Sequence, residues 1–429
     1  MDLENKIKTK KATITIIGMG YVGLPLACGF ASAGFKTFGL DNNSQKIKKI
    51  NQGVSYIEDI KNKEIKININ NKKLSATTDE KVLKKSDIII ICVPTPLDKY
   101  KQPDISLLKQ SVHTIKKFLK KDQLIILEST TYPGTTQEII QPILEKTGLK
   151  AGKDFFLAFS PERIDPGNKK YKVKDLSKVI GGTSKKGTNL ACLLYASFIE
   201  NVFPVSSPKV AEMTKLLENT FRVVNISMIN EIALLCDKIK IDVWEVIEAA
   251  KTKPYGFMPF YPGPGIGGHC ISIDPFYLSW KAKEYNFYAR FIELAGQINS
   301  QMPHFVITKI IFALNKNKKP INGSKILIWG VSYKKDISDI RESPACSVIE
   351  QLIKKGGKVE YFDPFVKKFK INNKQINRVS DKNLQKYDCI VILTAHSGFD
   401  YEKIAQKAKL IIDTRNAIKS RKHKNVFHL

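Results

Sequence analysis

The fold of this chain is indicated most directly by the stretch Ala12-Thr-Ile-Thr-Ile-Ile-Gly18-Met-Gly20-Tyr-Val-Gly23-Leu-Pro-Leu-Ala27. Its apolar, β-branched first half predicts a buried strand, and the apolar run after Gly23 predicts a helix. Between them stands the pattern G-x-G-x-x-G, which binds a dinucleotide when a strand and a helix flank it in this way. Gly18 permits the tight turn, Gly20 lets a pyrophosphate approach the backbone, and Gly23 lets the helix pack closely on the strand.

A second apolar run, Lys36-Thr-Phe-Gly-Leu40, ends at Asp41. An acid at this distance from the glycines suits hydrogen bonds to both ribose hydroxyls, which favours NAD over NADP as the cofactor. The alternative is a glycine-rich turn that binds no ligand. The order of strand, glycines, helix and acid favours the cofactor site.

Residues 12 to about 205 alternate between strand-like and helix-like patterns, which predicts a parallel, doubly wound α/β sheet. The polar segment Asn68-Ile-Asn-Asn-Lys-Lys73 is expected to be a loop. Three strands end in polar motifs, and ligands of such sheets bind at the carboxyl ends of strands. The motifs are Val93-Pro-Thr95, Glu128-Ser-Thr130 and Ser160-Pro-Glu162-Arg163. The expected strands are Ile14–Ile17, Ile88–Val93, Leu124–Leu127, Phe155–Phe159 and Lys178–Ile180.

The middle of the chain changes to helical patterns, and a second α/β unit follows it. Long helical periodicity covers Lys209–Ile241, and shorter patterns cover Asp242–Lys251 and Tyr277–Met302. We expect this helical middle to pair with a second copy, so that the protein forms a homodimer or a higher homo-oligomer. The predicted domains are residues 1–205, 206–305 and 306–429. The strands expected in the last domain are Lys325–Val331, Val359–Asp363, Cys389–Thr394 and Leu410–Asp413.

The composition suits a cytoplasmic enzyme of several domains. The 429 residues are too many for one ordinary core, and 43% of them are hydrophobic. No apolar run is long enough for a membrane span or a signal core. Seven scattered cysteines without C-x-x-C spacing predict no disulfide framework and no metal site. The net charge of +29 comes from lysines along the whole chain. It is expected to attract anionic ligands at the surface, without a specific nucleic-acid site.

A glycine-dense turn, Tyr261-Pro-Gly-Pro-Gly-Ile-Gly-Gly-His-Cys270-Ile-Ser-Ile-Asp274, presents one cysteine with an acid four residues on. A cysteine presented in this way suits a nucleophile, although a buried cysteine is more often an inert part of a core. Lys215 and Asn219 are four residues apart on the long predicted helix and share a face, with Arg222 nearly on the same side. These three can hold an oxyanion and sugar oxygens, or they form an ordinary polar helix face.

The segment Tyr333-Lys-Lys-Asp-Ile-Ser-Asp-Ile-Arg341-Glu-Ser-Pro344 is dense in charge and directly follows a predicted strand. Lys334 and Arg341 could each meet a phosphate or a uracil edge, and Arg415 follows another strand in the same way. A solvated loop is the alternative.

Taken in chain order, these motifs resemble the UDP-glucose/GDP-mannose dehydrogenase family over nearly the whole sequence. The resemblance implies an NAD-binding domain in residues 1–205, a central dimerisation domain in residues 206–305 and a UDP-sugar-binding domain in residues 306–429. The motifs that carry it are Gly18-x-Gly20-x-x-Gly23, Glu128-Ser-Thr130, Ser160-Pro-Glu162, Lys215-x-x-x-Asn219, Gly267-Gly268-x-Cys270-x-x-x-Asp274 and Lys334-x-Asp336-x-x-x-x-Arg341.

The same resemblance implies the catalytic roles. Cys270 would be the nucleophile, Lys215 the catalytic lysine and Glu162 the general base of thioester hydrolysis. Asn219 and Thr130 would hold the reacting oxygen and a water, and Asp274 would support that water or Lys215. The residues implied to contact NAD are Gly18, Gly20, Tyr21, Val22, Gly23, Asp41, Lys46, Val93, Thr95, Thr130 and Arg341. The residues implied to contact the UDP-sugar are Glu162, Arg163, Ile164, Lys215, Asn219, Arg222, Gly267, Tyr333, Lys334 and Arg415.

The chemistry explains why a cysteine is needed. Oxidation of a primary alcohol to a carboxylate removes two hydrides, hence two NAD. Cys270 would add to the intermediate aldehyde, the second hydride would then leave, and water would hydrolyse the resulting thioester.

Three motifs resemble the branch of the family that acts on UDP-N-acetylhexosamines for surface-polysaccharide synthesis. They are Ser160-Pro-Glu-Arg163-Ile-Asp-Pro-Gly167, Asn219-Thr-Phe-Arg222 and the stretch Pro262–Leu278. Relatives that use the N-acetylmannosamine epimer tend to carry a His and an Arg before the glycine loop. This chain has Thr252-Lys-Pro-Tyr-Gly-Phe-Met-Pro259 there, which favours UDP-N-acetylglucosamine. UDP-N-acetylmannosamine, UDP-N-acetylgalactosamine and UDP-glucose remain alternatives.

Two other classes of protein fit less well. A two-electron hydroxyacid dehydrogenase needs neither a cysteine nucleophile nor residues 320–429. A basic nucleic-acid-binding protein would not need the predicted site, and the lysines of this chain do not cluster in a recognition pattern.

Overall fold

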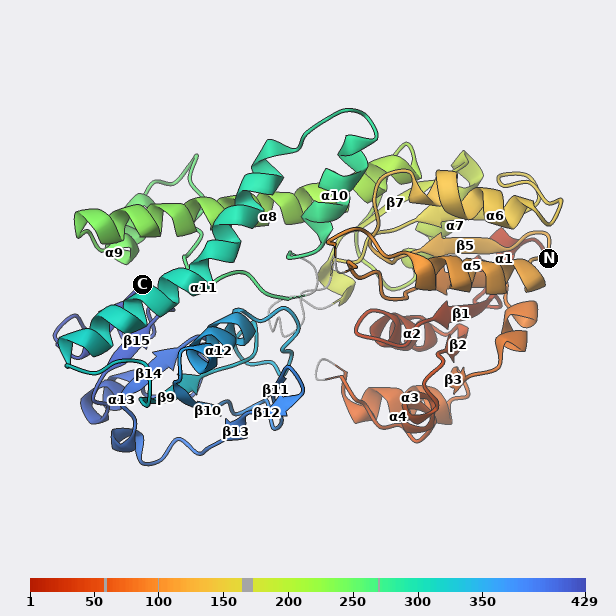
Figure 1. Cartoon of the computed structure of the whole chain (residues 1–429). Helices are drawn as coiled ribbons and strands as arrows, with labels where there is room; N and C mark the ends of the chain where they lie inside the picture. The colour runs from red at the N-terminus through yellow and green to blue at the C-terminus, as the bar shows by residue number, and fades with distance from the viewer. Residues whose placement is uncertain (58–59, 99, 164–172, 269–270) are drawn as a thin grey trace. The chain divides into compact units, whose positions relative to one another are not determined.

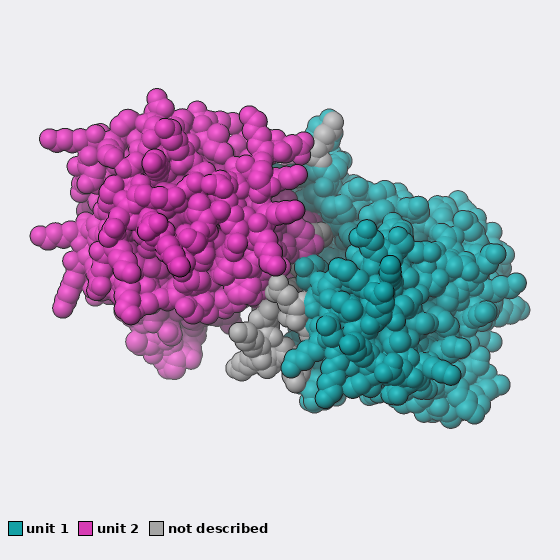
Figure 2. Space-filling view, turned by 90° about the horizontal axis from the view of Figure 1, so that it is seen from below, with its two compact units in different colours: residues 1–218, 276–287 teal, residues 219–275, 288–429 magenta. Residues whose placement is uncertain are grey.

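The structure is a computed structural model that describes residues 1–57, 60–98, 100–163, 173–268 and 271–429. It divides into two compact units, residues 1–218 with 276–287 and residues 219–275 with 288–429 (Figure 2). Each unit contains its own twisted sheet with helices packed on it (Figure 1). The predicted fold class is confirmed: two Rossmann-like, doubly wound α/β domains and a helical middle with one long helix. The three domain boundaries stay a prediction.

The sheet of the first unit has eight strands in the order β3-β2-β1-β4-β5-β6-β7-β8. Its central strands are runs of isoleucine and leucine, and all of β4 and β5 is buried. Burial on both faces is what a parallel sheet covered by helices requires. The strands are β1 (Thr13–Ile17), β2 (Lys36–Leu40), β3 (Leu74–Thr77), β4 (Ile88–Ile91), β5 (Leu124–Leu127), β6 (Phe156–Phe159), β7 (Lys178–Gly182) and β8 (Val202–Pro204).

Helices cover both faces of this sheet. Residues of α1, α2 and α7 share one core with alternate strand residues such as Ile88 and Ile90. The opposite strand face, including Ile89 and Ile91, is also fully buried. The helical elements of this part are α1 (Leu3–Lys8), α2 (Gly23–Ser32), α3 (Ser44–Asn51), α4 (Asn62–Asn70), η1 (Glu80–Lys85), α5 (Ser106–Phe118), η2 (Thr135–Ile140), α6 (Gln141–Glu145), η3 (Val173–Asp175) and α7 (Lys185–Tyr195).

The helical middle and the second α/β unit complete the chain. The second sheet is parallel, with the order β13-β10-β9-β14-β15-β16 and a buried core on each face. The helices of the middle are α8 (Pro208–Ile239), α9 (Val243–Ala250), α10 (Asp274–Lys283) and α11 (Arg290–Lys316), of which α8 and α11 are long. The elements that follow are β9 (Lys325–Trp329), α12 (Pro344–Lys354), β10 (Lys358–Phe362), β11 (Lys370–Ile371), β12 (Lys374–Gln375), β13 (Asn377–Arg378), η4 (Leu384–Lys386), β14 (Cys389–Ile392), α13 (Tyr401–Lys407), β15 (Ile411–Asp413) and β16 (Val426–His428).

The segment 68–73, expected to be a loop, is partly helical. Asn68 to Asn70 form the last turn of α4, and Asn68 is buried. Its amide nitrogen donates to Ser32 Oγ (3.0 Å) and to the backbone carbonyl of Glu64 (3.2 Å). A polar side chain therefore sits in the core because its hydrogen bonds are satisfied there, which its residue type alone does not reveal.

The helix expected over Tyr277–Met302 is in fact two helices. The chain leaves α10 after Lys283, passes through Asn286 in the left-handed region (φ 55°) and re-enters a helix at Arg290. Helix α11 then continues through Pro303 to Lys316. A proline inside a helix removes a hydrogen bond and costs about 3 kcal/mol. Buried neighbours such as Met302 and Val306 stabilise the helix across that break.

One strand pair differs from the predicted all-parallel sheet. β7 pairs antiparallel with β6, and β8 runs parallel to β7. Strand direction depends on how the chain returns to the sheet, which apolar runs do not encode.

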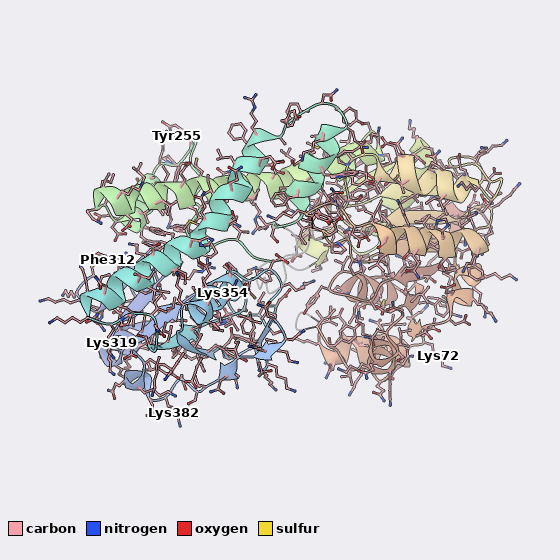
Figure 3. All side chains as sticks on the ribbon, viewed as in Figure 1. Lys72, Tyr255, Phe312, Lys319, Lys354 and Lys382 are labelled. Atoms are coloured by element: carbon pink, nitrogen blue, oxygen red, sulfur yellow. The ribbon has the colours of Figure 1, made fainter. Side chains whose placement is uncertain are left out.

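No helix among the described residues is long and apolar enough to cross a membrane. Lysines such as Lys72, Lys319, Lys354 and Lys382 project from the surface (Figure 3).

Candidate active site

Five strands of the first sheet end at one edge, and each is followed by a residue that the sequence predicts to belong to a site. β1, β2, β4, β5 and β6 are mutually parallel, so their carboxyl ends meet there. The residues that follow them are Gly18, Asp41, Val93, Thr130 and Glu162. The carboxyl edge is where ligands of doubly wound sheets bind.

The glycine turn after β1 has the geometry that the sequence predicts. Gly18 is in the left-handed region (φ 93°), and a Cβ there would lie 2.6 Å from the Cys92 carbonyl oxygen. A Cβ on Gly23 would lie 1.9 Å from the Gly18 carbonyl oxygen, so helix and turn need this glycine for packing. A Cβ on Gly20 would meet nothing within 4 Å. Space at Gly20, beside the start of α2, fits the approach of a pyrophosphate.

The residues at the start of α2 leave its amino end open. Val22 is the N-cap residue of α2 and makes no side-chain cap. Tyr21, also predicted to contact NAD, is 40% exposed. The first amides of the helix can therefore bind an anionic ligand.

Asp41 is held beside the glycine turn by backbone donors. Its carboxylate accepts from the Met19 amide (Oδ2, 2.9 Å) and the Asn43 amide (Oδ1, 2.9 Å). Lys46 Nζ lies 3.3 Å from Asp41 Oδ2. A carboxylate has about four acceptor positions, so these three donors leave about one position for a ribose hydroxyl, and displacement of Lys46 by the ribose would free a second. The glycines and Asp41 together fit NAD.

The ends of β4 and β5 are tied to each other by side-chain hydroxyls. Thr95 Oγ1 donates to the Thr130 carbonyl oxygen (2.7 Å), and Ser129 Oγ donates to the Val93 carbonyl oxygen (2.7 Å). Thr95 is buried, so its hydrogen bond holds the residues after β4 against those after β5 at the carboxyl edge of the sheet. The Thr130 hydroxyl makes no hydrogen bond to the part of the chain that the structure describes.

A buried charged cluster, Glu128–Lys178–Glu162, lies at the same edge. Lys178 Nζ is 2.6 Å from Glu128 Oε2, 3.4 Å from Glu162 Oε2 and 3.2 Å from the Pro161 carbonyl oxygen. Tyr195 donates its hydroxyl to Glu128 Oε1. Burial raises the pKa of Glu128 to about 7, although Lys178 opposes that shift. Burial disfavours the charge of Lys178, but the two carboxylates outweigh it and raise the pKa of the ammonium.

Arg163 and Lys215 have contrasting surroundings. Arg163 forms a two-pronged pair with Glu218 of α8 (Nε to Oε2 3.3 Å, NH2 to Oε1 2.5 Å) and donates to the Ser177 carbonyl oxygen (2.8 Å). Lys215 lies three residues before Glu218 and is only 8% exposed. Its ammonium has no ion pair or hydrogen bond with any described residue. Ile164, predicted to contact the sugar, lies outside the described residues.

The second unit places two predicted catalytic residues together. Asn219 Nδ2 donates to Asp274 Oδ2, and both side chains are buried. Arg222, predicted to lie nearly on the side of Lys215 and Asn219, is exposed. Cys270 and His269 lie outside the described residues.

The glycine loop before them is fixed by two asparagines. Asn230 Oδ1 accepts from the Gly263 amide (3.0 Å), and Asn299 Oδ1 accepts from the Ile266 amide (2.6 Å). α8 and α11 therefore position the backbone of residues 263–266 from two sides.

The charged loop after β9 packs against this glycine loop. A Cβ on Gly267 would lie 2.8 Å from Tyr333 Cβ, and the Gly268 amide donates to the Arg341 carbonyl oxygen (3.1 Å). The Arg341 guanidinium pairs with Asp339 (NH2 to Oδ2 2.6 Å). Lys334, which is half-buried, accepts at its backbone carbonyl from Ser332 Oγ (2.8 Å).

Arg415 faces the same loop. Its Nε donates to the Leu393 carbonyl oxygen (2.8 Å), and a Cβ on Gly263 would lie 2.5 Å from its NH1. Burial lowers the pKa of Arg415 to about 10, although Asp413 opposes that shift. The guanidinium stays charged at neutral pH and can recognise a phosphate. The structure thus brings Gly267, Tyr333 and Arg415 close to one loop.

The sequence interpretation missed the partners of these residues. Lys178 was expected only as part of a strand, and Glu218, Asn230 and Asn299 were not singled out. A lysine at the first position of a fully buried strand is the signal that could have identified Lys178, because a buried lysine requires an anionic partner.

Fold and site together define an NAD-dependent dehydrogenase. Models of the UDP-glucose/GDP-mannose dehydrogenase family match the chain along most of its length. The NAD binding domain matches residues 12–199, the central domain residues 209–301 and the UDP binding domain residues 327–420.

Several relatives are similar over nearly their full lengths. UDP-N-acetyl-D-glucosamine 6-dehydrogenase of Pseudomonas aeruginosa is 36% identical over 393 residues, which cover 91% of this chain and 92% of the relative. UDP-N-acetyl-D-mannosamine dehydrogenase of Pyrococcus horikoshii is 39% identical over 413 residues, 95% and 96% of the two chains. A solved structure of UDP-D-ManNAc dehydrogenase from Pyrococcus horikoshii has a TM-score of 0.88 at 36% identity and covers 97% and 98% of the two chains.

The chain belongs to the UDP-glucose/GDP-mannose dehydrogenase family. It is an NAD-dependent UDP-sugar dehydrogenase, as the sequence motifs predict.

Proposed function

We propose that the chain oxidises C6 of a UDP-N-acetylhexosamine to the uronate in a four-electron reaction that uses two NAD and a covalent intermediate on Cys270. The observation that carries this proposal is the buried polar set on α8. Lys215 has no counter-ion among the described residues, and Asn219 is bonded to the buried Asp274. A buried lysine without a partner is costly for folding, which favours a functional reason for its position.

Each residue has a defined task in this scheme. The glycine turn, Asp41 and the ends of β4 and β5 would hold NAD, which would supply the hydride acceptor for each oxidation. Lys215 and Asn219 stabilise the oxygen at C6 as negative charge develops on it. The Cys270 thiolate bonds to the aldehyde carbon, and loss of the second hydride leaves a thioester. Glu162 takes a proton from the attacking water, the carbon–sulfur bond breaks, and the thiolate of Cys270 is released.

A hydrogen-bond donor beside the proposed catalytic residues supports an acetamido sugar as the substrate. Arg163 follows Glu162 directly, and a rearrangement of its pair with Glu218 would let it donate to an acetamido carbonyl. The absence of a His and Arg pair in residues 252–259 favours UDP-N-acetylglucosamine as the first candidate. UDP-N-acetylmannosamine is the second candidate, because a dehydrogenase of that sugar is 39% identical to this chain. The uronate would serve surface-polysaccharide synthesis.

Two further features concern the setting of the enzyme. The six described cysteines are free, which suits the reducing cytoplasm as its location. Exposed apolar residues on α8, among them Met228 and Leu235, favour a homodimer.

The reaction is tested by counting NADH for each sugar consumed. We expect two NADH from UDP-N-acetylglucosamine, and the panel includes UDP-N-acetylmannosamine, UDP-N-acetylgalactosamine and UDP-glucose. A yield of one NADH for every substrate that reacts would contradict the four-electron scheme. The highest kcat/KM in the panel identifies the epimer.

The role of Cys270 is tested by the Cys270→Ser variant. A serine hydroxyl is hardly ionised at neutral pH and is a much weaker nucleophile than a thiolate, so uronate formation should fall by about 100-fold or more. Cys236→Ser is a matched control, because Cys236 is a buried core residue with no proposed role. Parental uronate formation by Cys270→Ser would refute the covalent route.

A further inference from the structure

Two of the three ionisable side chains in the cluster Glu128–Lys178–Glu162 are buried, and the third, Glu162, is partly buried. Glu128 and Lys178 are 1% and 5% exposed, and Lys178 lies between the two carboxylates. Its shorter contact is to Glu128 (2.6 Å) and its longer contact is to Glu162 (3.4 Å). A folded protein rarely buries such a set for stability alone, because desolvation offsets most of the Coulombic attraction.

The other ionisable groups that face the cluster leave its charge unchanged near neutral pH. Burial raises the pKa of the Tyr195 hydroxyl and of the Cys92 thiol well above their ordinary values. Both groups are therefore neutral, and Tyr195 acts as a hydrogen-bond donor to Glu128. The charges that reach Glu162 through this cluster are the ammonium of Lys178 and, as pH rises through about 7, the carboxylate of Glu128.

Each oxygen of the Glu162 carboxylate faces a donor. Oε1 accepts from the backbone amide of Arg163 (2.6 Å), and Oε2 faces Lys178 Nζ. Lys178 in turn is held by Glu128 and by the Pro161 carbonyl oxygen (3.2 Å). A cation beside a carboxylate favours its ionised form, and a second carboxylate nearby opposes ionisation.

We infer that the buried Lys178–Glu128 pair is a positioning unit that orients the Glu162 carboxylate and sets the pH range in which Glu162 acts as the base of thioester hydrolysis. This inference rests on the proposed function, in which Glu162 accepts the proton of the attacking water. Lys178 and Glu128 are positioning residues, because they act through Glu162. Neither oxidation step depends on them.

The two positioning residues make opposite predictions. Lys178→Met removes the cation that favours ionised Glu162. The acidic limb of the pH–rate profile for thioester hydrolysis should therefore move to higher pH by about 1 to 3 units. At neutral pH hydrolysis should slow by about 10-fold or more, since a positioned base contributes 100-fold or more. Glu128→Gln removes the opposing carboxylate at the pH values where Glu128 is ionised, so there Glu162 should ionise more readily and the same limb should move to lower pH. A purely structural defect would not move the limb in opposite directions.

The measurement is the decay of the acyl-enzyme on Cys270. Enzyme, NAD and UDP-N-acetylhexosamine are mixed, quenched in acid at set times and analysed by intact mass spectrometry from pH 5.5 to 9. Lys178→Met should produce two NADH per site in a rapid burst and then accumulate the acyl-enzyme. Lys178→Arg keeps the charge and should restore most of the decay rate. Lys185→Met, an exposed lysine of α7, is the control and should behave as the parent.

The outcomes separate this inference from the proposed function. A parent enzyme that forms one NADH per sugar contradicts the proposed function itself. A parent that forms two, with Lys178→Met decaying at the parental rate and an unmoved acidic limb, overturns the inference alone. Lys178→Met leaves Glu128 buried without its cation and can fail to fold. In that case Lys178→Met combined with Glu128→Gln, a neutral pair, should still accumulate the acyl-enzyme, and parental decay would overturn the inference.

Discussion

The glycines of the dinucleotide turn differ in what surrounds them. A Cβ on Gly23 would overlap the Gly18 carbonyl oxygen at 1.9 Å, so this glycine is needed by the fold. A Cβ on Gly20 would meet nothing within 4 Å, and the φ of Gly20 is not in the left-handed region. Gly20 is therefore not needed for packing, which fits the predicted approach of a pyrophosphate to its backbone.

This contrast gives a matched pair of variants. Gly20→Ala should fold with unchanged or slightly higher stability, and it should weaken NAD binding by about 10-fold or more, about 1.4 kcal/mol. Gly23→Ala should lower the free energy of unfolding by about 1 to 3 kcal/mol or more through overpacking. Thermal unfolding without NAD and calorimetric titration with NAD measure the two effects. Equal NAD affinity of Gly20→Ala and the parent would disprove the role of Gly20.

At the residue scale, the sequence predicts those features that depend on local spacing. Gly18, Gly20, Gly23 and Asp41 follow from a pattern of about 30 residues, and the structure places them beside one another. The pairing of Lys178 with Glu128 joins residues 50 positions apart. No local pattern encodes that contact, because it depends on which strands become neighbours in the sheet.

At the element scale, the long helix α8 stabilises a rare element of the first unit. Glu212 of α8 accepts from the Gly134 amide (2.6 Å), the Thr136 amide (2.9 Å) and Thr136 Oγ1 (2.6 Å), just where the π-helix η2 begins. Burial raises the pKa of Glu212 to about 7, although these hydrogen bonds oppose the shift.

This raised pKa predicts a pH-dependent contribution of Glu212 to stability. An ordinary glutamate has a pKa near 4.5, so between about pH 4.5 and 7 the folded state binds a proton that the unfolded state has lost. The contribution of Glu212 is therefore present below this window and is lost as pH rises through it. Glu212→Gln does not titrate. From the lower to the upper end of this pH window, the parent should therefore lose on the order of 1 to 3 kcal/mol of unfolding free energy relative to Glu212→Gln. Urea unfolding at pH 5, 6 and 7 measures it, and a constant difference would contradict the prediction.

Elements with unbroken apolar runs are predicted well by the sequence. The strands over Ile88–Ile91 and Leu124–Leu127 and most of α8 follow from periodicity. The antiparallel direction of β7 and the break between α10 and α11 do not. They depend on tertiary packing, which stabilises Pro303 inside a helix and a left-handed residue at Asn286.

At the scale of the whole molecule, one helix presents an apolar stripe that the described chain leaves uncovered. Phe221, Met228, Leu235 and Ile239 of α8 recur at intervals of seven or four residues and are 47% to 54% exposed. Such spacing places them on one face of the helix, the pattern by which helices pair. Tyr255, after α9, also projects outward and is 73% exposed (Figure 3). These residues support the predicted homodimer, in which α8 would pack against a second copy.

The double variant Met228→Glu with Leu235→Glu tests that interface. Two carboxylates buried in a self-complementary contact lose their hydration and face their own symmetry mates, so the assembly should dissociate to single chains. Sedimentation velocity at several protein concentrations measures the change in mass. Ile353→Glu is the matched control, because Ile353 of α12 is 44% exposed but lies outside the stripe, and it should leave the mass unchanged. The net charge of +29 repels a second copy, so raising the ionic strength should strengthen the parental dimer. A double variant that keeps the parental mass would place the interface elsewhere.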